Sequence, residues 1–337
     1  MTTFGPTSQF VKSFTCLFVR KITVSLPVCI FYAKILLFGE YGIIEDSQGL
    51  TLPYSFYKGT LKFSENQSDF EKKSNESLSK YAQYLSELNL PEAFKINVEA
   101  FKKDIEKGLF FDSNIPQGYG VGSSGALVAA IFEKYSFIKY NPEEISKNQL
   151  KDLKKVFGEL ESYFHGKSSG IDPLICYMNL PILIENKESV DKVSIPKEEA
   201  GKGAIFLIDS GSVGETGPMV QIFFEKLKNE GFRKTLKEEF IKYNNACIDT
   251  FLNKEMTPFF KHLKDLSKWA YVHFKPMIPT NVYNAWKKGL DTNAYYLKLC
   301  GSGGGGVCSP IAGEGEEEEV RGKSSGRQQQ CACAFAH

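Results

Sequence analysis

The chain has 337 residues, of which 42% are hydrophobic and 24% charged, enough for a substantial core and, at this length, for two domains. Its net charge of +1 gives no electrostatic reason to expect a nucleic-acid partner, and no apolar run reaches the ~18 residues that cross a membrane. The eight cysteines contain no CxxC pair and no metal-like spacing with the four histidines, so we expect reduced thiols in a cytoplasmic protein.

The two ends of the chain differ in composition from the middle. Residues 1–39 have no acidic side chain but several basic and hydroxyl ones, which fits a transit peptide, an added strand or an altered gene start. After residue 307, a run of four glutamates is followed by Gly, Ser, Arg and Gln with no apolar period. We therefore expect residues 1–30 to be an extension and residues 307–337 to be a disordered tail.

The first half of the chain alternates strand and helix patterns. Residues 32–44 form an apolar run broken by two glycines, which predicts a strand, a tight turn and a second strand. Residues 53–63 alternate aromatic and polar side chains as a strand would, residues 66–108 have a helical period, and residues 109–115 predict another strand. Lys34 lies inside the first strand, where it either turns outward to solvent or pairs with a carboxylate, because burying an unpaired ammonium is costly.

Residues 116–126, PQGYGVGSSGA, are the most informative segment. Three glycines at alternate positions let the backbone approach a ligand closely, and a helix is predicted to begin at about Ser123. The unpaired N–H groups of a helix start attract anions, which indicates a bound phosphate. The stretch from Gly120 to Gly125 also matches GxGxxG, although no strand pattern leads to the acidic residues about 20 positions on. A dinucleotide site and a glycine turn that only packs closely are therefore the alternatives.

A strongly amphipathic helix is predicted at residues 148–164, and Gly166 ends it. Glu161 lies at the edge of its apolar stripe, where a carboxylate is either a salt-bridge partner or a ligand for a hard cation such as Mg²⁺. A Ser/Gly loop then leads to Asp172, which Pro173 follows. An Asp before a Pro suits a helix N-cap, and the alternative role is a general base at the end of the loop.

The second half predicts strands at residues 182–185, 204–209 and 295–299 around a helical region from 218 to about 286. A domain boundary is expected near residues 180–200, where prolines and a Lys/Glu-rich stretch interrupt the pattern. The last strand runs into Cys-Gly-Ser-Gly-Gly-Gly-Gly. These glycines either pack against the phosphate loop or form a flexible linker.

Four segments, in this order and spacing, resemble the GHMP kinase superfamily and, within it, the mevalonate kinases, over about residues 31–306. They are a lysine strand with a Gly-Glu turn at 34–41, the glycine-rich loop at 116–126, the helix and loop at 161–172, and the strand and glycine run at 298–306. The resemblance implies an α+β fold with a ribosomal protein S5-like ATP-binding domain at 31–185 and a ferredoxin-like domain at 186–306. Because the family continues after this point with a helix and strands that this sequence does not show, we expect an open sheet edge.

The resemblance also implies roles for the residues of the site. Asp172 would take the proton of the acceptor hydroxyl, and Lys34 would stabilise the Asp172 charge and the developing alkoxide. Ser124 and Glu161 would hold Mg²⁺ on the phosphates of ATP. The loop would cradle those phosphates through Pro116, Gly118, Gly120, Gly122, Ser123, Ser124 and Gly125. Phosphoryl transfer depends mainly on such positioning and charge neutralisation.

On the acceptor side, the resemblance implies contacts from Glu40, Tyr41, His165, Thr216, Gly301 and Ser302. The family's histidine is Tyr41 here, and the basic residue that the eukaryotic enzymes have two positions before Thr216 is Gly214. A carboxylate-bearing acceptor would therefore need another cation, such as Lys34 or Lys275.

The sequence thus predicts an ATP-dependent kinase that phosphorylates a hydroxyl group of a small molecule. Mevalonate is the first candidate, with 5-phosphomevalonate as its product in isoprenoid biosynthesis, and homoserine, galactose and phosphomevalonate are rival acceptors within the superfamily. A non-catalytic nucleotide-binding relic and a dehydrogenase are the alternatives from other classes. No nucleic-acid or membrane partner is expected, and a homodimer stays open.

Overall fold

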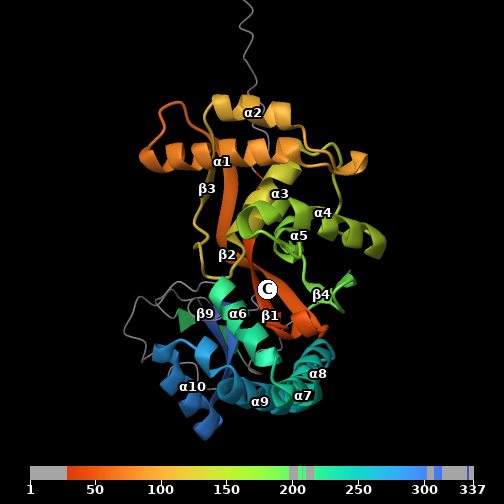
Figure 1. Ribbon diagram of the computed structural model, residues 1–337, viewed down its shortest axis with the longest axis vertical. Coiled ribbons are helices and arrows are strands. Elements are labelled where there is room, and N and C mark those ends of the chain that lie inside the picture. The colour runs from red at the N-terminus through yellow and green to blue at the C-terminus, as the bar shows by residue number, and fades with distance from the viewer. Residues whose placement is uncertain are drawn as a thin grey trace, which may run out of the picture.

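Two antiparallel sheets, each packed against helices, follow one another along the chain (Figure 1). The computed structural model describes residues 29–196, 204–206, 208–209, 216–301, 307–312 and 332–333. The expected α+β class is confirmed. Among the helices in these ranges, none combines the length and the hydropathy needed to cross a bilayer.

The first sheet is built around the long strand β2, Gly49–Phe63. Strand β1, Phe31–Phe38, pairs along it, while β3, Leu109–Ser113, pairs with its last residues. Strand β4, Ile182–Ile184, pairs with its first residues, and β5, Val190–Lys192, extends the sheet beyond β4. The alternating pattern that predicted a strand at 53–63 therefore marks only the later part of β2.

Five α-helices and a short 3₁₀ turn cover this sheet: α1 (Asp69–Glu87), η2 (Glu92–Phe94), α2 (Val98–Glu106), α3 (Ser123–Tyr135), α4 (Lys147–His165) and α5 (Ile171–Met178). Helices α1 and α4 each start at a serine whose hydroxyl accepts a backbone N–H in a capping box, which fixes where they begin. The rings of Phe132, Phe157 and Tyr177 lie within 5.0–5.6 Å of one another and join α3, α4 and α5. This aromatic contact fixes the three helices that carry the candidate site.

The second sheet has β8, Tyr295–Cys300, paired along its whole length with β9, Val307–Ala312. Strands β6 (Ala204–Phe206), β7 (Ile208–Asp209) and β10 (Ala332–Cys333) complete it, with β6 and β7 on β9 and β10 on β6. The prediction of a disordered tail from residue 307 is thus wrong for β9 and β10. These short segments have no strand pattern of their own, and their pairing with β8 and β6 makes them strands. Residues 313–331 and 334–337 lie outside the described ranges, as do residues 1–28.

The helices of the second half gather on one side of its sheet in Figure 1: α6 (Thr216–Leu227), α7 (Glu230–Thr235), α8 (Ile241–Leu252), α9 (Met256–His273) and α10 (Thr280–Thr292), with a π-helical turn η3 (Leu236–Phe240) and a 3₁₀ turn η4 (Lys275–Met277). Their core also contains Leu37 and Phe38 of β1 and Leu50 and Leu52 of β2. The strands β1 and β2 therefore contribute to both cores, and the domain boundary near residue 185 stays a prediction.

The structure corrects two local predictions. The second strand expected at the end of residues 32–44 is a 3₁₀ helix, η1, at Gly42–Glu45, because the amides of Ile43 and Ile44 bond back to Gly39 and Tyr41. The prediction that Asp172 is a helix N-cap is also wrong. Helix α5 begins one residue earlier, after Gly170, and Asp172 lies in its first turn.

Candidate functional site

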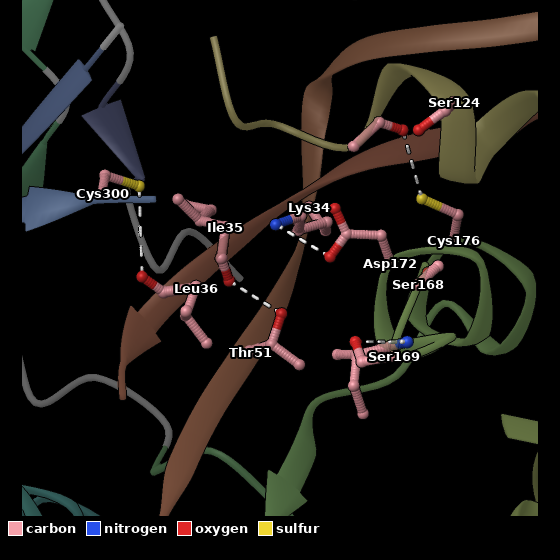
Figure 2. Close-up of polar contacts among 12 residues, drawn as sticks. Lys34, Ile35, Leu36, Thr51, Ser124, Ser168, Ser169, Asp172, Cys176 and Cys300 are labelled. Atoms are coloured by element: carbon pink, nitrogen blue, oxygen red, sulfur yellow. Dashed lines mark hydrogen bonds and ion pairs between the residues drawn. The ribbon is translucent and has the colours of Figure 1, made fainter. Parts of the chain in front are cut away.

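Lys34 of β1 and Asp172 of α5 form an ion pair at the centre of the candidate site (Figure 2). The Lys34 Nζ lies 2.9 Å from the Asp172 Oδ1, and the side chains are 7% and 34% exposed, respectively. Burial lowers the pKa of Lys34, but the charge and hydrogen bond of Asp172 outweigh it, so that the pKa lies above its ordinary value. The alternative in which Lys34 turns outward to solvent is therefore wrong, and its ammonium is a fixed positive charge beside a reachable carboxylate.

The glycine-rich loop lies directly against this pair. The Lys34 amide donates a hydrogen bond to the carbonyl of Val121 at 2.9 Å. A Cβ at Gly122, which has φ of 83°, would come within 2.8 Å of the Lys34 side chain, and one at Gly125 within 2.7 Å of the Asp172 backbone. Glycine is needed at both positions because only its backbone leaves room for the lysine and for helix α5. The loop and the ion pair therefore form one unit.

Helix α3 begins at Ser123 without a side-chain cap on its first amides. Before it, Gly118 and Gly120 have positive φ and lie on the surface, so the loop presents backbone to solvent. An uncapped helix start of this kind favours an anion. The sheet beside it is antiparallel throughout the described residues and so lacks the parallel βαβ unit of a dinucleotide site.

The glycine run after β8 begins against the same loop. The Gly301 Cα lies 3.6 Å from the position that a Cβ of Gly120 would occupy. This run was expected either to pack against the glycine-rich loop or to form a flexible linker. At its first residue it packs against the loop. Ser302 and the four glycines after it lie outside the described ranges.

Ser124, in the first turn of α3, faces the carboxylate of Glu161 on α4. Its hydroxyl donates to the Glu161 Oε1 at 2.9 Å, and the His165 Nε2 lies 3.0 Å from the same hydroxyl. The other carboxylate oxygen, Oε2, accepts a hydrogen bond from the Ser168 hydroxyl at 2.5 Å. Burial, and then the negative charge of Asp172, raise the pKa of Glu161 to about 7, against the opposing effect of both hydroxyls.

These oxygen donors suit a hard cation. Mg²⁺ is bound in kinases by one or two protein oxygens together with nucleotide phosphates, and Ser124 and Glu161 offer a hydroxyl and a carboxylate beside the phosphate loop. No group of three or more His, Cys, Asp or Glu side chains that could hold a metal occurs in the described part of the chain. The donor set therefore fits a cation that is shared with phosphates.

Ser168 was missed by the sequence analysis, although it stands in the Ser/Gly loop that was singled out. Its backbone N–H donates to Ser162 and its hydroxyl accepts from the Gly170 amide, so the loop holds the hydroxyl in place. The loop has two adjacent serines, Ser168 and Ser169, and the sequence does not indicate which of them contacts the site. Only the fold shows that Ser168 faces Glu161. Ser169 instead contacts the amide of Ile171 (Figure 2).

The residues expected on the acceptor side are dispersed. Glu40 forms a buried ion pair with Lys298 of β8, a lysine that the sequence analysis did not single out, and the Tyr41 ring packs against Phe223 and Phe274. His165 lies on the Ser124 side instead. The side chain of Thr216 lies outside the described part of the structure.

The two cations considered for an acceptor carboxylate both have partners. The Lys34 ammonium is paired with Asp172, and the Lys275 ammonium lies over the Tyr283 ring at 5.1 Å from its centroid.

Comparisons with known proteins give a family match over part of the chain. Residues 79–179, which include the glycine-rich loop, Glu161 and Asp172, match the family model of the GHMP kinases N terminal domain. A sequence comparison with curated proteins gives no match.

The fold is similar to that of several solved kinases. L. major mevalonate kinase in complex with R-mevalonate has a TM-score of 0.60 and 13% identity, covering 88% of this chain and 90% of that one. Methanococcus jannaschii mevalonate kinase has a TM-score of 0.57 and 20% identity, covering 89% and 94%. Streptococcus pneumoniae phosphomevalonate kinase in complex with phosphomevalonate and AMPPNP has a TM-score of 0.54 and 14% identity, covering 88% and 94%. At these identities the similarity shows a shared two-domain α+β fold.

Proposed function

We propose that this chain, which resembles the GHMP kinase superfamily and its mevalonate kinases, is an ATP-dependent kinase that phosphorylates a hydroxyl group of a small molecule. The observation that carries the proposal is the ion pair of Lys34 and Asp172 beside the glycine-rich loop. It places a carboxylate that can accept a proton next to a fixed positive charge and an anion-binding helix start.

In the proposed reaction, the Asp172 carboxylate takes the proton of the acceptor hydroxyl. The hydroxyl oxygen forms a bond to the γ-phosphorus of ATP while the bond between that phosphorus and the bridging oxygen breaks, which releases ADP and a phosphomonoester. Lys34 is paired with the Asp172 carboxylate and offsets the negative charge on the attacking oxygen. The proton stays on Asp172 until product leaves.

The loop from Pro116 to Gly125 is proposed to cradle the phosphates through its backbone amides. Ser124 and Glu161 are proposed to hold Mg²⁺, which when bound would neutralise phosphate charge. Ser168 and His165 hold Glu161 and Ser124 in place by hydrogen bonds. Ser124 comes from α3, Glu161 and His165 from α4, and Ser168 from the loop before α5, so the fold of the first half brings the site together.

Mevalonate is the proposed acceptor. Two of the three solved relatives named above are mevalonate kinases, one of them in complex with R-mevalonate, and the third is a phosphomevalonate kinase. Phosphomevalonate, homoserine and galactose are the rival acceptors to be tested beside it. A cytoplasmic location and a homodimer stay predictions from the sequence.

The proposal is tested by ADP release from Mg·ATP with each of the four acceptors in turn. Release that depends on one acceptor and on Mg²⁺ supports the kinase and names its substrate. Binding of ATP with no ADP release in the presence of any of them would instead favour a nucleotide-binding relic. Binding of NAD rather than ATP would favour a dehydrogenase.

A further inference from the structure

The turn that connects β1 to η1 has a strained backbone. Tyr41 has φ of 61° and ψ of −38°, and the amide of Gly42 donates to the carbonyl of Glu40 at 2.6 Å. This is a γ-turn with positive φ at its central residue, a form that is rare and strained in a non-glycine residue. Such a conformation persists only where the surrounding structure holds it, and strained turns of this kind cluster at functional sites.

A buried ion pair holds one side of this turn. The Lys298 Nζ lies 2.6 Å from the Glu40 Oε1, and the two side chains are only 4% and 7% exposed. The same ammonium donates to the carbonyl of Leu299 at 2.5 Å and lies 5.8 Å from the centroid of the Phe38 ring. Glu40 and Lys298 are 258 residues apart in sequence, so the pair joins the end of β1 to β8.

An aromatic contact holds the other side. The Tyr41 ring is buried, with its centroid 4.8 Å from that of Phe223 on α6 and 5.0 Å from that of Phe274 after α9. Tyr41 therefore anchors the turn in the core of the second half, and its implied contact with the acceptor stays a prediction.

Both strands that meet at this pair lead to the candidate site. Strand β1 carries Lys34. Strand β8 ends at Cys300, and Gly301 follows it, beside Gly120 of the glycine-rich loop. The Cys300 thiol lies 4.0 Å from the carbonyl of Leu36 on β1 (Figure 2), so the two strands lie close together between the pair and the site. The spacing between Lys34 and Gly301 therefore depends on how β1 is held to β8.

We propose that Lys298 is a positioning residue for the acceptor. By holding Glu40, it keeps the strained turn closed and fixes the strand that carries Lys34 against the strand that leads to Gly301. The inference rests on the proposed kinase function, in which the resemblance places this turn on the acceptor side. The glycine-rich loop is held to Lys34 through Val121 and Gly122, so it moves with β1 as one unit and keeps its own geometry. Loss of Lys298 should therefore affect the acceptor and not the binding of nucleotide.

The test compares Lys298→Met with Lys287→Met as a matched control. Lys287 forms an ion pair with Asp291 in which both side chains are 60% exposed, so its loss should change little. For each variant we would measure the affinity for a fluorescent ATP analogue with Mg²⁺, kcat and the acceptor KM by ADP release, and hydrogen exchange of the amides at residues 42–47.

Lys298→Met should lower kcat/KM for the acceptor about tenfold or more, since small displacements of reacting groups are costly. The turn amides should exchange faster, and nucleotide affinity should change less than about twofold.

A double variant, Glu40→Gln with Lys298→Met, separates positioning from stability. Neutralising both members of a buried pair leaves no isolated charge, so the double variant should regain much of the stability that Lys298→Met loses. It still lacks the ion pair, however. Its kcat/KM for the acceptor should therefore stay low, and the amides of residues 42–47 should still exchange faster than in the wild type. Recovery of stability, kcat/KM and slow exchange together would overturn the proposal, because Lys298 would then matter only for folding.

Hydrogen exchange distinguishes a failure of the proposed kinase function from a failure of the proposed positioning role of Lys298. If the wild-type chain phosphorylates none of the acceptors, the proposed function fails. Unchanged exchange at residues 42–47 in both Lys298 variants would instead overturn the positioning role, whatever the activity.

Discussion

The molecule contains two lysine–carboxylate pairs of opposite character. In one, the Lys34 ammonium is buried but the Asp172 carboxylate is 34% exposed, beside a glycine-rich loop. In the other, Lys298 and Glu40 are both below 10% exposed and are surrounded by Phe38 and the end of β8. We call these the open pair and the sealed pair. A carboxylate that solvent can reach can exchange a proton with a ligand, whereas a sealed one can only hold neighbouring structure in place.

The difference shows that a buried lysine alone does not identify a catalytic site. Burial of a charge costs free energy in both pairs, and a partner offsets that cost in both. What distinguishes the open pair is its surroundings: an uncapped helix start, a loop of glycines and the hydroxyls around Glu161. Four substitutions test whether the open pair and the sealed pair differ in this way.

The largest effect is expected from Asp172→Asn in the open pair. The substitution removes the proposed base but keeps the size of the side chain, so turnover should fall about 10²–10⁴-fold. Stability should fall moderately, because the buried Lys34 ammonium loses its charged partner but keeps an amide oxygen as hydrogen-bond acceptor. ADP-release kinetics and thermal unfolding measure the two effects. Turnover close to that of the wild type would remove Asp172 from the mechanism.

In the sealed pair the effect should be on stability. Lys298→Met leaves the Glu40 carboxylate buried without its partner, which typically costs about 3–5 kcal/mol of unfolding free energy. Urea denaturation of this variant and of Lys34→Met measures the contrast. The loss should be smaller for Lys34→Met, because Asp172 can be hydrated where it stands. Equal losses in the two variants would mean that the pairs do not differ in the way described.

Gly122→Ala tests how closely the loop and the open pair fit. Its Cβ would lie 2.8 Å from the Lys34 side chain at a backbone φ of 83°, so it strains the turn and displaces the lysine. We expect about a 10–100-fold loss of turnover, as for other small displacements of reacting groups. Gly217→Ala is the matched control, because no atom of the described residues lies within 4 Å of the added Cβ. A Gly122→Ala variant as active as the control would show that Lys34 has room to move.

The smallest effect is expected from Ser168→Ala. The variant loses one of the two hydroxyls that hold the Glu161 carboxylate but keeps Ser124. The concentration of Mg²⁺ needed for half-maximal turnover should rise about three- to tenfold, in line with the loss of one hydrogen bond to a charged group. Ser169→Ala is the control, since its hydroxyl contacts only the Ile171 amide among the described interactions. If Ser168→Ala and Ser169→Ala raised this Mg²⁺ concentration equally, the effect would come from the loop as a whole and not from the Ser168 hydroxyl.

Much of the open pair could be predicted from the sequence because its residues stand in local patterns. A lysine in an apolar strand, glycines before a helix and an acidic residue after a Ser/Gly loop each have a local physical reason. These patterns left alternatives open for Lys34 and Asp172, and the resemblance implied that the two act together; the structure brings Lys34, Gly122 and Asp172 into contact. The roles assigned to these residues stay predictions, because geometry alone does not measure turnover.

The sealed pair could not be predicted, because nothing near Glu40 or Lys298 in sequence indicates a partner 258 residues away. Tyr41 illustrates the same limit. The resemblance implied an acceptor contact, which stays a prediction, whereas nothing in the Gly-Glu-Tyr turn indicated that its ring packs against aromatic residues of the second half. Strand β9 was missed for a related reason, since pairing with β8 and not its own sequence pattern makes it a strand.

The central claim is that the open pair transfers a phosphoryl group to a small hydroxyl acceptor. Incubation of the wild-type chain with Mg·ATP and mevalonate, followed by mass spectrometry of the small molecules, tests it most directly. The account predicts a product heavier than the acceptor by one phosphoryl group, together with an equal amount of ADP, and neither with Asp172→Asn. ATP bound by the wild-type chain, with no phosphorylated product from mevalonate, phosphomevalonate, homoserine or galactose, would contradict it.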